Sequence, residues 1–244
     1  MRMMHEAKTH DHNCFLTLTY SDEHLPANYS LDKQAFPKFI RRLRKTGIKA
    51  RYFHCGEYGE QTLRPHYHAC LFGHAFQEDR KHWTNRGGLP VWRSDELERL
   101  WPYGNSEIGS LTFESAAYVA RYVTKKITGA RAESHYERLN PLTGELFQVE
   151  PEFATMSRNP GIGSAWYDKF STDVFPSDQV IVNGKPCKPP RYYDERLRAS
   201  DPDTFEKIRT RRRLGRNRDD ETPERLKVRE TCAQARLSLK PRGL

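Results

Sequence analysis

Residues 64–72 read RPHYHACLF, a run of strand-forming residues in which two histidines flank one tyrosine. Successive side chains of a strand point to opposite faces of a sheet, so His66 and His68 are expected to share one face. Two imidazoles on the same face can bind one divalent cation when a third ligand arrives from a neighbouring element. The sequence therefore predicts a β-strand that carries two metal ligands.

The third ligand is expected from the residues just upstream. Residues 51–59 read RYFHCGEYG and predict a strand at 51–55 that leads into a glycine-containing loop. An antiparallel hairpin that sets Glu57 opposite His66 places a carboxylate beside the two imidazoles. If the turn is tighter, Glu60 takes the place of Glu57.

Two other interpretations of this hairpin remain open. Cys55, His66, His68 and Cys70 could together hold a structural zinc ion, although such sites usually use short paired knuckles rather than residues spread along two strands. An isolated His-x-His pair is also a common feature of strands that bind nothing. A second motif is needed to choose among these interpretations.

Residues 115–127 read SAAYVARYVTKKI and predict an amphipathic helix with Ser115 as its N-cap. Apart from the apolar stripe, the helix carries a set of aromatic and basic residues about one turn apart: Tyr118, Tyr122, Lys125 and Lys126. Two tyrosines beside lysines can also be ordinary surface residues. In combination with the histidine strand, the pattern is much more specific.

With these motifs in this order, the chain resembles the replication initiators of the HUH endonuclease superfamily, and most closely those of gokushovirus-type phages of the Microviridae. The resemblance rests on FLTLTY at 15–20, on CGEYGE at 55–60 with RPHYH at 64–68, and on the tyrosine helix. Family members carry a cysteine-rich segment ahead of the residues that correspond to 4–6. This sequence is therefore expected to represent either a shorter relative or an alternative start.

The resemblance implies an HUH endonuclease fold, with an antiparallel sheet of about five strands, a central histidine strand, and the tyrosine helix across the same face. It also implies that a tyrosine attacks a phosphate of single-stranded DNA at a replication origin, leaving a 5′-phosphotyrosyl link and a free 3′-OH. A second tyrosine then cleaves the regenerated origin while the first strand is rejoined. One enzyme would thus initiate and terminate rolling-circle replication, together with a host helicase and polymerase.

A tyrosine hydroxyl is a weak nucleophile near neutral pH and needs nearby positive charge. The expected cofactor is Mg²⁺ or Mn²⁺, which would polarise the scissile phosphate from the ligands Glu57, His66 and His68. Lys125 or Lys126 could lower the phenol pKa or stabilise the leaving 3′ oxygen. Because both lysines lie one turn beyond Tyr122, this tyrosine is expected to be more reactive than Tyr118.

The remaining pattern predicts an α+β domain with helices flanking the sheet. Strands are expected at 14–20 and 108–113, helices at 31–46 and 95–100, an irregular loop at 74–90, a turn at 140–145 between two short strands, and an Asn183-Gly184 hairpin. In the first strand, Thr17 and Thr19 are either strand-surface threonines or residues that position DNA or the sheet core. From about Tyr193 the chain is expected to be helical.

A net charge of +9 and a pI near 9.3 suit a partner with phosphates. Residues 195–244 hold 15 Lys and Arg against 9 Asp and Glu. This run can be a solvated helix face, but DNA contact is favoured, and the expected DNA-binding residues are Arg121, Arg211, Arg212 and Arg213. The sequence thus predicts an endonuclease core at 1–135, accessory strands and loops at 136–193, and a basic helical region at 194–244.

Five scattered cysteines argue against a disulfide framework, and no apolar run is long enough for a membrane span or a signal peptide. A cytoplasmic protein is expected, in the host bacterium if a phage encodes it. Two other functions remain open. The chain could bind single-stranded DNA without catalysis, or it could be a transposase or relaxase that uses the same tyrosine chemistry.

Overall fold

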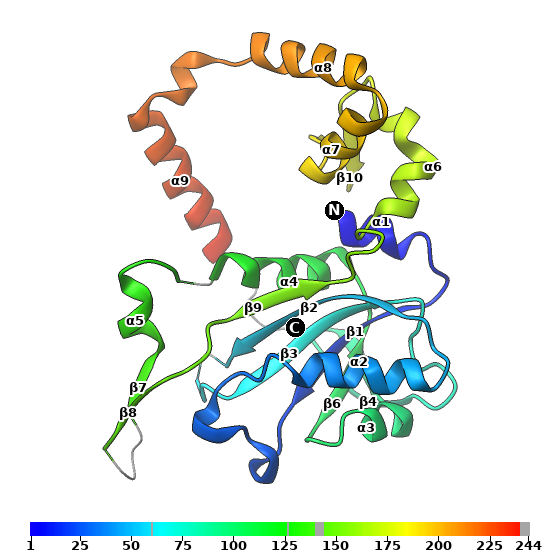
Figure 1. Ribbon diagram of the computed structural model, residues 1–244, viewed down its shortest axis with the longest axis vertical. Helices are drawn as coiled ribbons and strands as arrows, with labels where there is room; N and C mark the ends of the chain where they lie inside the picture. Colours follow the sequence, from blue (N-terminus) through cyan, green and yellow to red (C-terminus); the bar gives the residue numbers. More distant parts are fainter. Residues whose placement is uncertain (60, 126, 140–143, 240–244) are drawn as a thin grey trace. The chain divides into compact units, whose positions relative to one another are not determined.

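The computed structural model describes residues 1–59, 61–125, 127–139 and 144–239, without the side chains of residues 27, 122–125 and 131. The chain forms two compact units, one spanning Arg2–Ala165 and the other joining Met1 with Trp166–Leu244 (Figure 1). These units are defined by packing. The three functional segments predicted from the sequence, 1–135, 136–193 and 194–244, stay predictions.

An antiparallel sheet is the framework of the first unit. Over the described residues it has seven strands, in the spatial order β4 (Lys81–Arg86), β5 (Leu89–Arg93), β6 (Ser106–Gly109), β1 (Asn13–Thr19), β3 (Pro65–Phe72), β2 (Arg51–Tyr58) and β9 (Phe153–Met156). The predicted α+β class and antiparallel pairing are confirmed. The predicted number of about five strands is wrong, and the histidine strand β3 lies inside the sheet next to its middle strand, β1.

Two of the extra strands come from the segment that the sequence predicts to be an irregular loop. β4 is largely exposed, so it lacks the alternation of apolar and polar residues that reveals a half-buried strand. It pairs with β5 through a turn at Gly87-Gly88, where φ is +57° and +78°. Positive φ at both central residues suits a tight hairpin turn and favours glycine.

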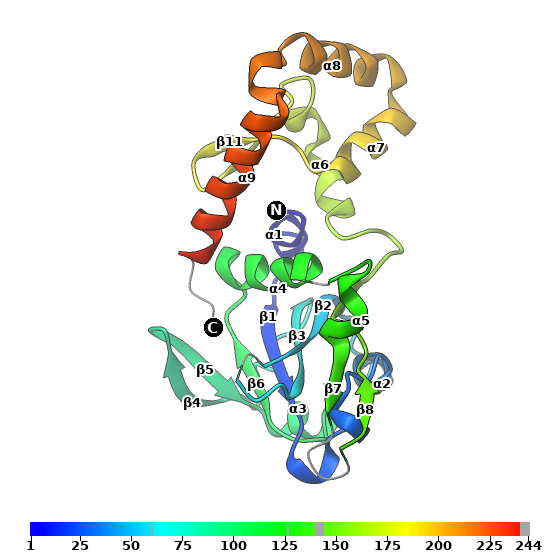
Figure 2. The same cartoon turned by 90° about the vertical axis from the view of Figure 1, so that its left-hand side faces the viewer.

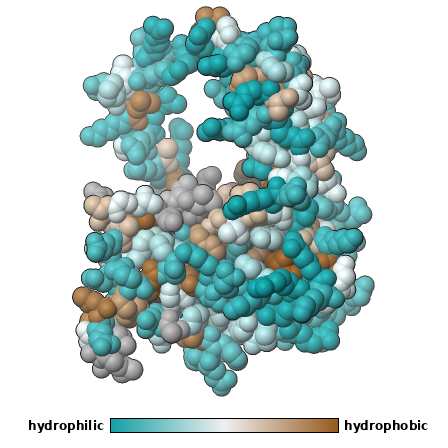
Figure 3. Space-filling view, viewed as in Figure 1, coloured by the Kyte–Doolittle hydropathy of each residue, from teal (hydrophilic) through white to brown (hydrophobic). Residues whose placement is uncertain are grey.

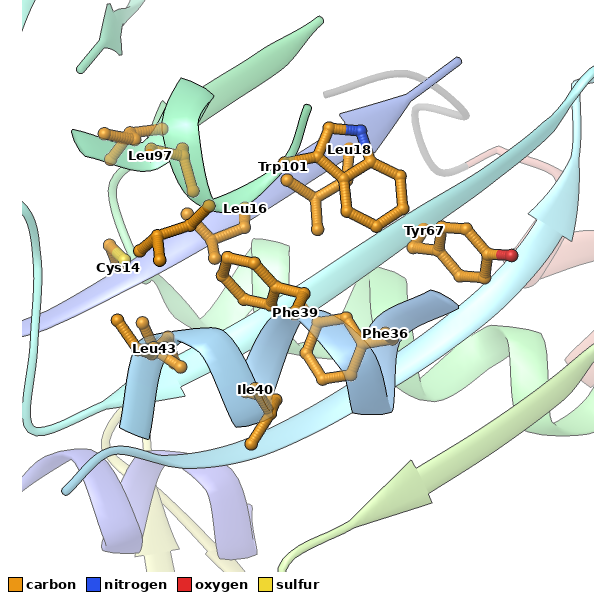
Figure 4. Packing of buried hydrophobic residues seen from close by; sticks show 14 of the residues in the cluster. Cys14, Leu16, Leu18, Phe36, Phe39, Ile40, Leu43, Tyr67, Leu97 and Trp101 are labelled. Carbon is orange, nitrogen blue, oxygen red and sulfur yellow. The ribbon is translucent and has the colours of Figure 1, made fainter. Parts of the chain in front are cut away.

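Two helices cover one face of the sheet. They are α2 (Ala35–Lys45), which begins four residues later than predicted, and α3 (Asp95–Leu100), whose predicted N-cap, Ser94, accepts a hydrogen bond from the amide of Leu97. The core on this face is shown in Figure 4, where Phe36 and Phe39 of α2 lie against side chains of the sheet and Trp101. Its strand residues come from alternate positions: Cys14, Leu16, Leu18, Tyr67, Ala69 and Leu71.

The other face carries α4 (Phe113–Lys125), which packs against β2, β3 and β9 and contacts α1 (Arg2–Ala7). The prediction of Ser115 as the N-cap is wrong, because the helix begins two residues earlier. Thr112 and Ser115 instead form reciprocal bonds, in which each backbone N–H donates to the other side-chain oxygen at 2.9 and 3.2 Å. This capping-box arrangement fixes the start of α4. The strand expected at 108–113 is β6, which ends at Gly109.

The shorter elements of the first unit connect these layers. They are the 3-10 helices η1 (Asp22–His24) and η2 (Ala27–Tyr29), the helix α5 (Arg131–Tyr136), and the paired strands β7 (Glu137–Leu139) and β8 (Leu146–Gln148). The pairing of β7 with β8 confirms the predicted short hairpin. Most of its turn, residues 140–143, lies outside the described residues.

The second unit is mainly helical, as predicted for the region from about Tyr193. Its elements are α6 (Ser164–Val174), β10 (Val180–Val182), β11 (Lys185–Cys187), α7 (Arg191–Ser200), α8 (Pro202–Leu214), η3 (Arg218–Glu221) and α9 (Pro223–Ser238). The predicted Asn183-Gly184 hairpin is confirmed, with φ of +49° and +74°. A small core joins α6, α7 and α8 through residues such as Tyr167, Tyr193 and Ile208.

The surface of this unit is strongly polar. In Figure 3 the side chains over α8 and α9 are mainly hydrophilic, and α9 has no buried residue. Of the helices within the described residues, none combines the length and the apolar character needed to cross a bilayer.

Candidate functional site

The pairing of β1, β2 and β3 brings polar residues together on the α4 face of the sheet. Glu57 of β2 lies opposite His66 of β3, as predicted from the hairpin. On the other side of β3, Thr17 and Thr19 of β1 lie opposite His68 and His66. Opposite residues of antiparallel strands point to the same face. The three strands therefore present a carboxylate, two imidazoles and two hydroxyls side by side.

One carboxylate oxygen is the centre of this cluster. Oε1 of Glu57 lies 2.7 Å from Nε2 of His66 and 2.9 Å from Nε2 of His68. One ligand atom from each of these residues lies within 4.8 Å of the others, and across the described ranges this is the group of His, Cys, Asp and Glu residues able to hold a metal ion. The predicted set of Glu57, His66 and His68 is thus brought together, while the alternative ligand Glu60 lies outside the described residues.

Neither cysteine of the alternative zinc site belongs to this group. Cys55 and Cys70 are fully buried, and burial raises the pKa of the Cys70 thiol. A protonated thiol is not a metal ligand, because zinc binds the thiolate. The described geometry therefore favours an oxygen and two nitrogens as the ligand atoms.

The hydrogen bonds of the two rings indicate which nitrogen atoms face the cluster. Nδ1 of His66 lies 3.1 Å from the carbonyl oxygen of Arg64, which can only accept, so Nδ1 carries a proton. Nε2 of the neutral ring then presents a lone pair to Oε1 of Glu57. Two acceptor atoms 2.7 Å apart require a positive charge between or beside them, either a proton or a metal cation.

The carboxylate has room for a further ligand bond. Oε2 of Glu57 is buried and has no hydrogen-bond partner among the described residues. A buried, unpartnered carboxylate oxygen is costly unless a cation or solvent satisfies it. The donor set, with one carboxylate and two imidazoles, fits a divalent cation such as Mn²⁺ or Mg²⁺, although Mg²⁺ favours oxygen ligands.

The ionisation of the cluster suits the same purpose. Burial alone would raise the pKa of Glu57, but hydrogen bonds from His66 and His68 outweigh burial, and the net pKa is lowered. Burial lowers the pKa of His68, although Glu57 opposes this effect. An ionised carboxylate and a neutral imidazole are the forms that bind metals.

Helix α4 places one of the two predicted nucleophiles in this cluster. The hydroxyl of Tyr118 donates a hydrogen bond to Oε1 of Glu57 at 3.2 Å, and the side chain is buried. Its ring packs edge-on against His68, with centroids 5.1 Å apart, and against Phe15 at 6.5 Å. The guanidinium of Arg121 lies 5.7 Å from the ring centroid, near enough for a cation–π contact.

The structure describes the other predicted residues unevenly. The side chains of Tyr122 and Lys125, and the whole of Lys126, lie outside the described residues. Arg211, Arg212 and Arg213 belong to α8 of the second unit, where Arg213 is exposed and Arg211 donates to the carbonyl oxygen of Pro176.

Arg212 is held within its own unit. Its guanidinium donates to the carboxylates of Asp178 and Asp194, and these contacts raise its pKa. The side chain is 25% exposed, less than that of a solvated arginine. Its clearest role is therefore to join three segments of the fold, and its predicted contact with DNA has no support in this geometry.

Sequence reasoning did not assign the contacts that orient the histidines. Nδ1 of His68 lies 3.1 Å from Oγ1 of Thr17, and the ring stacks on Phe15 with centroids 5.4 Å apart. Strand parity on β1 could have placed Phe15 and Thr17 on one face. The register between β1 and β3, which sets Thr17 against His68, could not be deduced because more than 40 residues separate the two strands in the sequence.

Comparison with known proteins identifies the lineage of this site. The model of a family of replication-associated proteins, of the ORF2 type, matches residues 13–127, which include Glu57, His66, His68 and Tyr118. The chain belongs to this family. No solved structure matches it.

Curated relatives of this replication-associated family member come from phages and a spiroplasma virus. It is 34% identical over 215 residues to the replication-associated protein VP4 of Bdellovibrio phage phiMH2K, an alignment that covers 84% of the chain and 64% of the relative. It is 35% identical over 209 residues to the replication-associated protein ORF2 of Spiroplasma virus 4, covering 80% and 60%. The chain thus spans less than two thirds of the length of these relatives.

Proposed function

We propose that this chain is a metal-dependent tyrosine endonuclease of the HUH type that nicks and rejoins single-stranded DNA during phage replication. The observation that carries the proposal is the meeting of three groups at Oε1 of Glu57: the Nε2 atoms of His66 and His68 and the hydroxyl of Tyr118. A candidate nucleophile therefore lies beside a candidate metal site. The names of the relatives support a role in replication inside the host cell.

When Mg²⁺ or Mn²⁺ is bound by Glu57, His66 and His68, it supplies positive charge that polarises the scissile phosphate. The protein itself orients the nucleophile. The hydrogen bond from Tyr118 to a carboxylate fixes the position of the phenol oxygen, and the packing of its ring against Phe15 and His68 limits its rotation. Such prior positioning lowers the entropy cost of the attack.

In the proposed reaction, the phenol oxygen of tyrosine attacks phosphorus while the bond from phosphorus to the 3′ oxygen breaks. The phenol loses its proton to a nearby base, and the leaving 3′ oxygen takes up a proton to become a 3′-OH. The phosphate stays linked to tyrosine and to the 5′ end of the downstream strand. Attack by a 3′-OH on this phosphotyrosine reverses the step and joins the strands, so the energy of the cut bond is conserved.

The other assignments belong to the same proposal. Lys125 and Lys126 would stabilise the phenolate or protonate the leaving oxygen, and Tyr122 would act in alternation with Tyr118. Arg121, Arg211 and Arg213 would contact DNA, and host helicase and polymerase would act on the nicked strand. Rolling-circle replication is the process that uses such a reaction at its start and its end.

The test uses overlapping single-stranded oligonucleotides that tile the genome encoding this chain, incubated with the full chain and Mn²⁺. One or a few oligonucleotides should form a protease-sensitive, slow-migrating adduct on a denaturing gel, and chelation should abolish the adduct. His66→Ala and His68→Ala should form none and yet bind DNA within a few-fold of the wild type, since many basic contacts set affinity.

The matched control is His24→Ala, which removes an exposed histidine of η1 outside the cluster and should leave the adduct intact. Cleavage that leaves no protein on the DNA would indicate metal-assisted hydrolysis and would overturn the tyrosine mechanism. If His66→Ala unfolds, a thermal melt of the wild type with and without chelator separates a structural metal from a catalytic one.

A further inference from the structure

A groove lies on the α4 face of the sheet beside the candidate metal site. It is a cavity of about 300 Å³ lined by residues of β1, β4, β5, β6 and the segment just before β6: Thr17, Thr19, Trp83, Arg86, Arg93, Asn105 and Glu107. Figure 2 shows the β4–β5 hairpin projecting at the edge of the sheet next to β6. The metal ligands do not line this groove, and nothing in the proposed chemistry uses the hairpin.

The groove displays a large aromatic side chain to solvent. Trp83 of β4 is 58% exposed, and the guanidinium of Arg93 lies 4.9 Å from its ring centroid. The strand pairing skips Trp83, because His82 pairs with Trp92 and Thr84 with Val91. This bulge re-aims the side chain. An exposed tryptophan held in one direction by a cation and a bulge is the kind of surface on which a planar ring can stack.

The charge around the groove favours a polyanion. Residues 80–94 contain four basic residues, Arg80, Lys81, Arg86 and Arg93, and no Asp or Glu. The lining has one carboxylate, Glu107, which accepts two hydrogen bonds from Arg86 at 2.8 and 3.1 Å. Arg93 contacts Glu98 at 2.9 Å and Asn105 at 3.4 Å. These partners hold the arginines in place along the groove, where phosphate oxygens can reach them.

The groove is also continuous with the candidate metal site. Thr17 and Thr19 line it, and Oγ1 of Thr17 lies 3.1 Å from Nδ1 of His68. A chain that lies in the groove therefore ends one side chain away from a metal ligand. This continuity is what an extended substrate needs if one part is held while another is cut.

We propose that the β4–β5 groove binds single-stranded DNA next to the cut, with one unpaired base stacked on Trp83 and the neighbouring phosphates against Arg86 and Arg93. This inference rests on the proposed function for the identity of the substrate. Stacking requires the open face of a base, which a duplex hides, so the groove selects a single strand. Thr17 and Thr19 then lie along the path between the stacked base and the metal site.

The experiment measures binding separately from cleavage. The full chain in chelator is titrated against fluorescein-labelled oligo-dT of about 20 nucleotides, a probe without sequence information. Trp83→Ala should lower the affinity about tenfold, as expected for the loss of one base–aromatic stack, while Trp83→Phe should keep most of it. The matched control is Leu89→Ala, which changes an exposed apolar residue of the same hairpin outside the groove lining and should bind within twofold of the wild type.

A second measurement locates the base directly. Wild-type protein is irradiated with an oligonucleotide that carries 5-iodouracil, and the cross-linked peptide should contain Trp83. This result does not depend on whether Trp83→Ala folds. Cross-links confined to peptides outside 81–93, or unchanged affinity of a folded Trp83→Ala variant, would overturn the proposal.

Two further probes fix the chemistry of the ligand. A duplex of the same length should lose no more than twofold in affinity when Trp83 is replaced. Tighter, Trp83-dependent binding of oligo-rU than of oligo-dT would assign the groove to RNA and overturn the proposal for DNA. Because chelator prevents cleavage, failure to form a covalent adduct refutes the proposed function alone, and loss of the Trp83 effect refutes the groove alone.

Discussion

Nδ1 of His66 lies 3.1 Å from the main-chain carbonyl oxygen of Arg64, two residues earlier in the same strand region. His68 is oriented differently, because its Nδ1 meets a side chain, the hydroxyl of Thr17. Outer contacts of this kind fix the ring and the tautomer of a metal-binding histidine. One of the two contacts can therefore be removed by a substitution, and the other cannot.

Replacement of Thr17 by Val should weaken metal binding without removing a ligand. The substitution keeps the branched shape of the strand residue but deletes the hydroxyl beside Nδ1 of His68, so the affinity for Mn²⁺ should fall by about tenfold or more. Isothermal titration calorimetry with the full chain measures the change. Thr17→Ser should restore most of the affinity, and Thr19→Val should serve as the control, since Thr19 Oγ1 donates to Asn105 instead. Equal affinities for Thr17→Val and wild type would remove Thr17 from the site.

Stability should fall with acidification because of a histidine that is no part of the site. His54 is fully buried and stacks on Phe36 with ring centroids 3.8 Å apart, and burial lowers its pKa from 6.5 to about 3. Below about pH 6.5 the unfolded chain binds a proton at His54 that the folded chain does not bind. The free energy of unfolding should therefore decrease as the pH falls from 6.5 toward 3, by ~1.4 kcal/mol per pH unit for this residue.

The variant His54→Phe isolates this contribution. Urea denaturation in chelator between pH 6.5 and 4.5 should show a shallower loss of stability than in the wild type, whatever the absolute stability of the variant. His5, whose pKa burial lowers to about 4, remains in both proteins and should keep part of the slope. Identical slopes in the two proteins would mean that His54 is protonated in the folded state.

The parts of the site that could be predicted are those set by local pairing. Glu57 and His66 are nine residues apart, so strand parity and a short hairpin are enough to place them opposite each other. Tyr118 could be predicted as a helix residue from its spacing to Tyr122. That α4 would lay Tyr118 on the histidine face came from the family resemblance, because periodicity does not say which sheet face a helix covers.

The missed features depend on long-range packing or on exposure. β9 at Phe153–Met156 pairs with β2, about 100 residues earlier, and nothing local in its sequence reveals that partner. β4 carries exposed residues on both sides, so its Trp83 looked like part of a loop. The start of α4 was misplaced because Thr112 and Ser115 are both good capping residues, and only the geometry shows which one precedes the helix.

Arg212 should be needed for the fold of the second unit. Replacement by Gln would leave the carboxylates of Asp178 and Asp194, which are 11% and 18% exposed, without their shared cation. Loss of one partner from such a group destabilises by roughly 3 kcal/mol. Hydrogen exchange read by mass spectrometry should show faster exchange in α7 and α8, with β1–β3 unchanged.

The neighbouring variant Arg213→Gln is the control, since Arg213 is exposed on the same helix and its loss should change stability by no more than about 0.5 kcal/mol. If Arg212→Gln keeps wild-type exchange in α7 and α8 but loses DNA affinity, the residue contacts DNA as the sequence predicted, and the structural role is wrong.

The last prediction concerns the division of labour between Tyr118 and Tyr122. Four residues separate them, so they occupy successive turns of α4, about 6 Å apart at Cβ. The Tyr118 hydroxyl already contacts Glu57, whereas Tyr122 has the two lysines one turn beyond it. Each single Phe variant should therefore still form a covalent adduct with a cleavable oligonucleotide, and the double variant should form none.

Mass spectrometry of the adduct identifies the tyrosine used by each protein. Wild type should give a mixture of phosphotyrosyl peptides at Tyr118 and Tyr122, with Tyr122 in excess if the lysines dominate reactivity and Tyr118 in excess if its contact with Glu57 does. Complete loss of the adduct in one single variant, with the other unaffected, would leave one nucleophile. The alternating cycle would then fail for this protein, because termination would need a second copy of the chain to supply the second tyrosine, while nicking by a single tyrosine would stand.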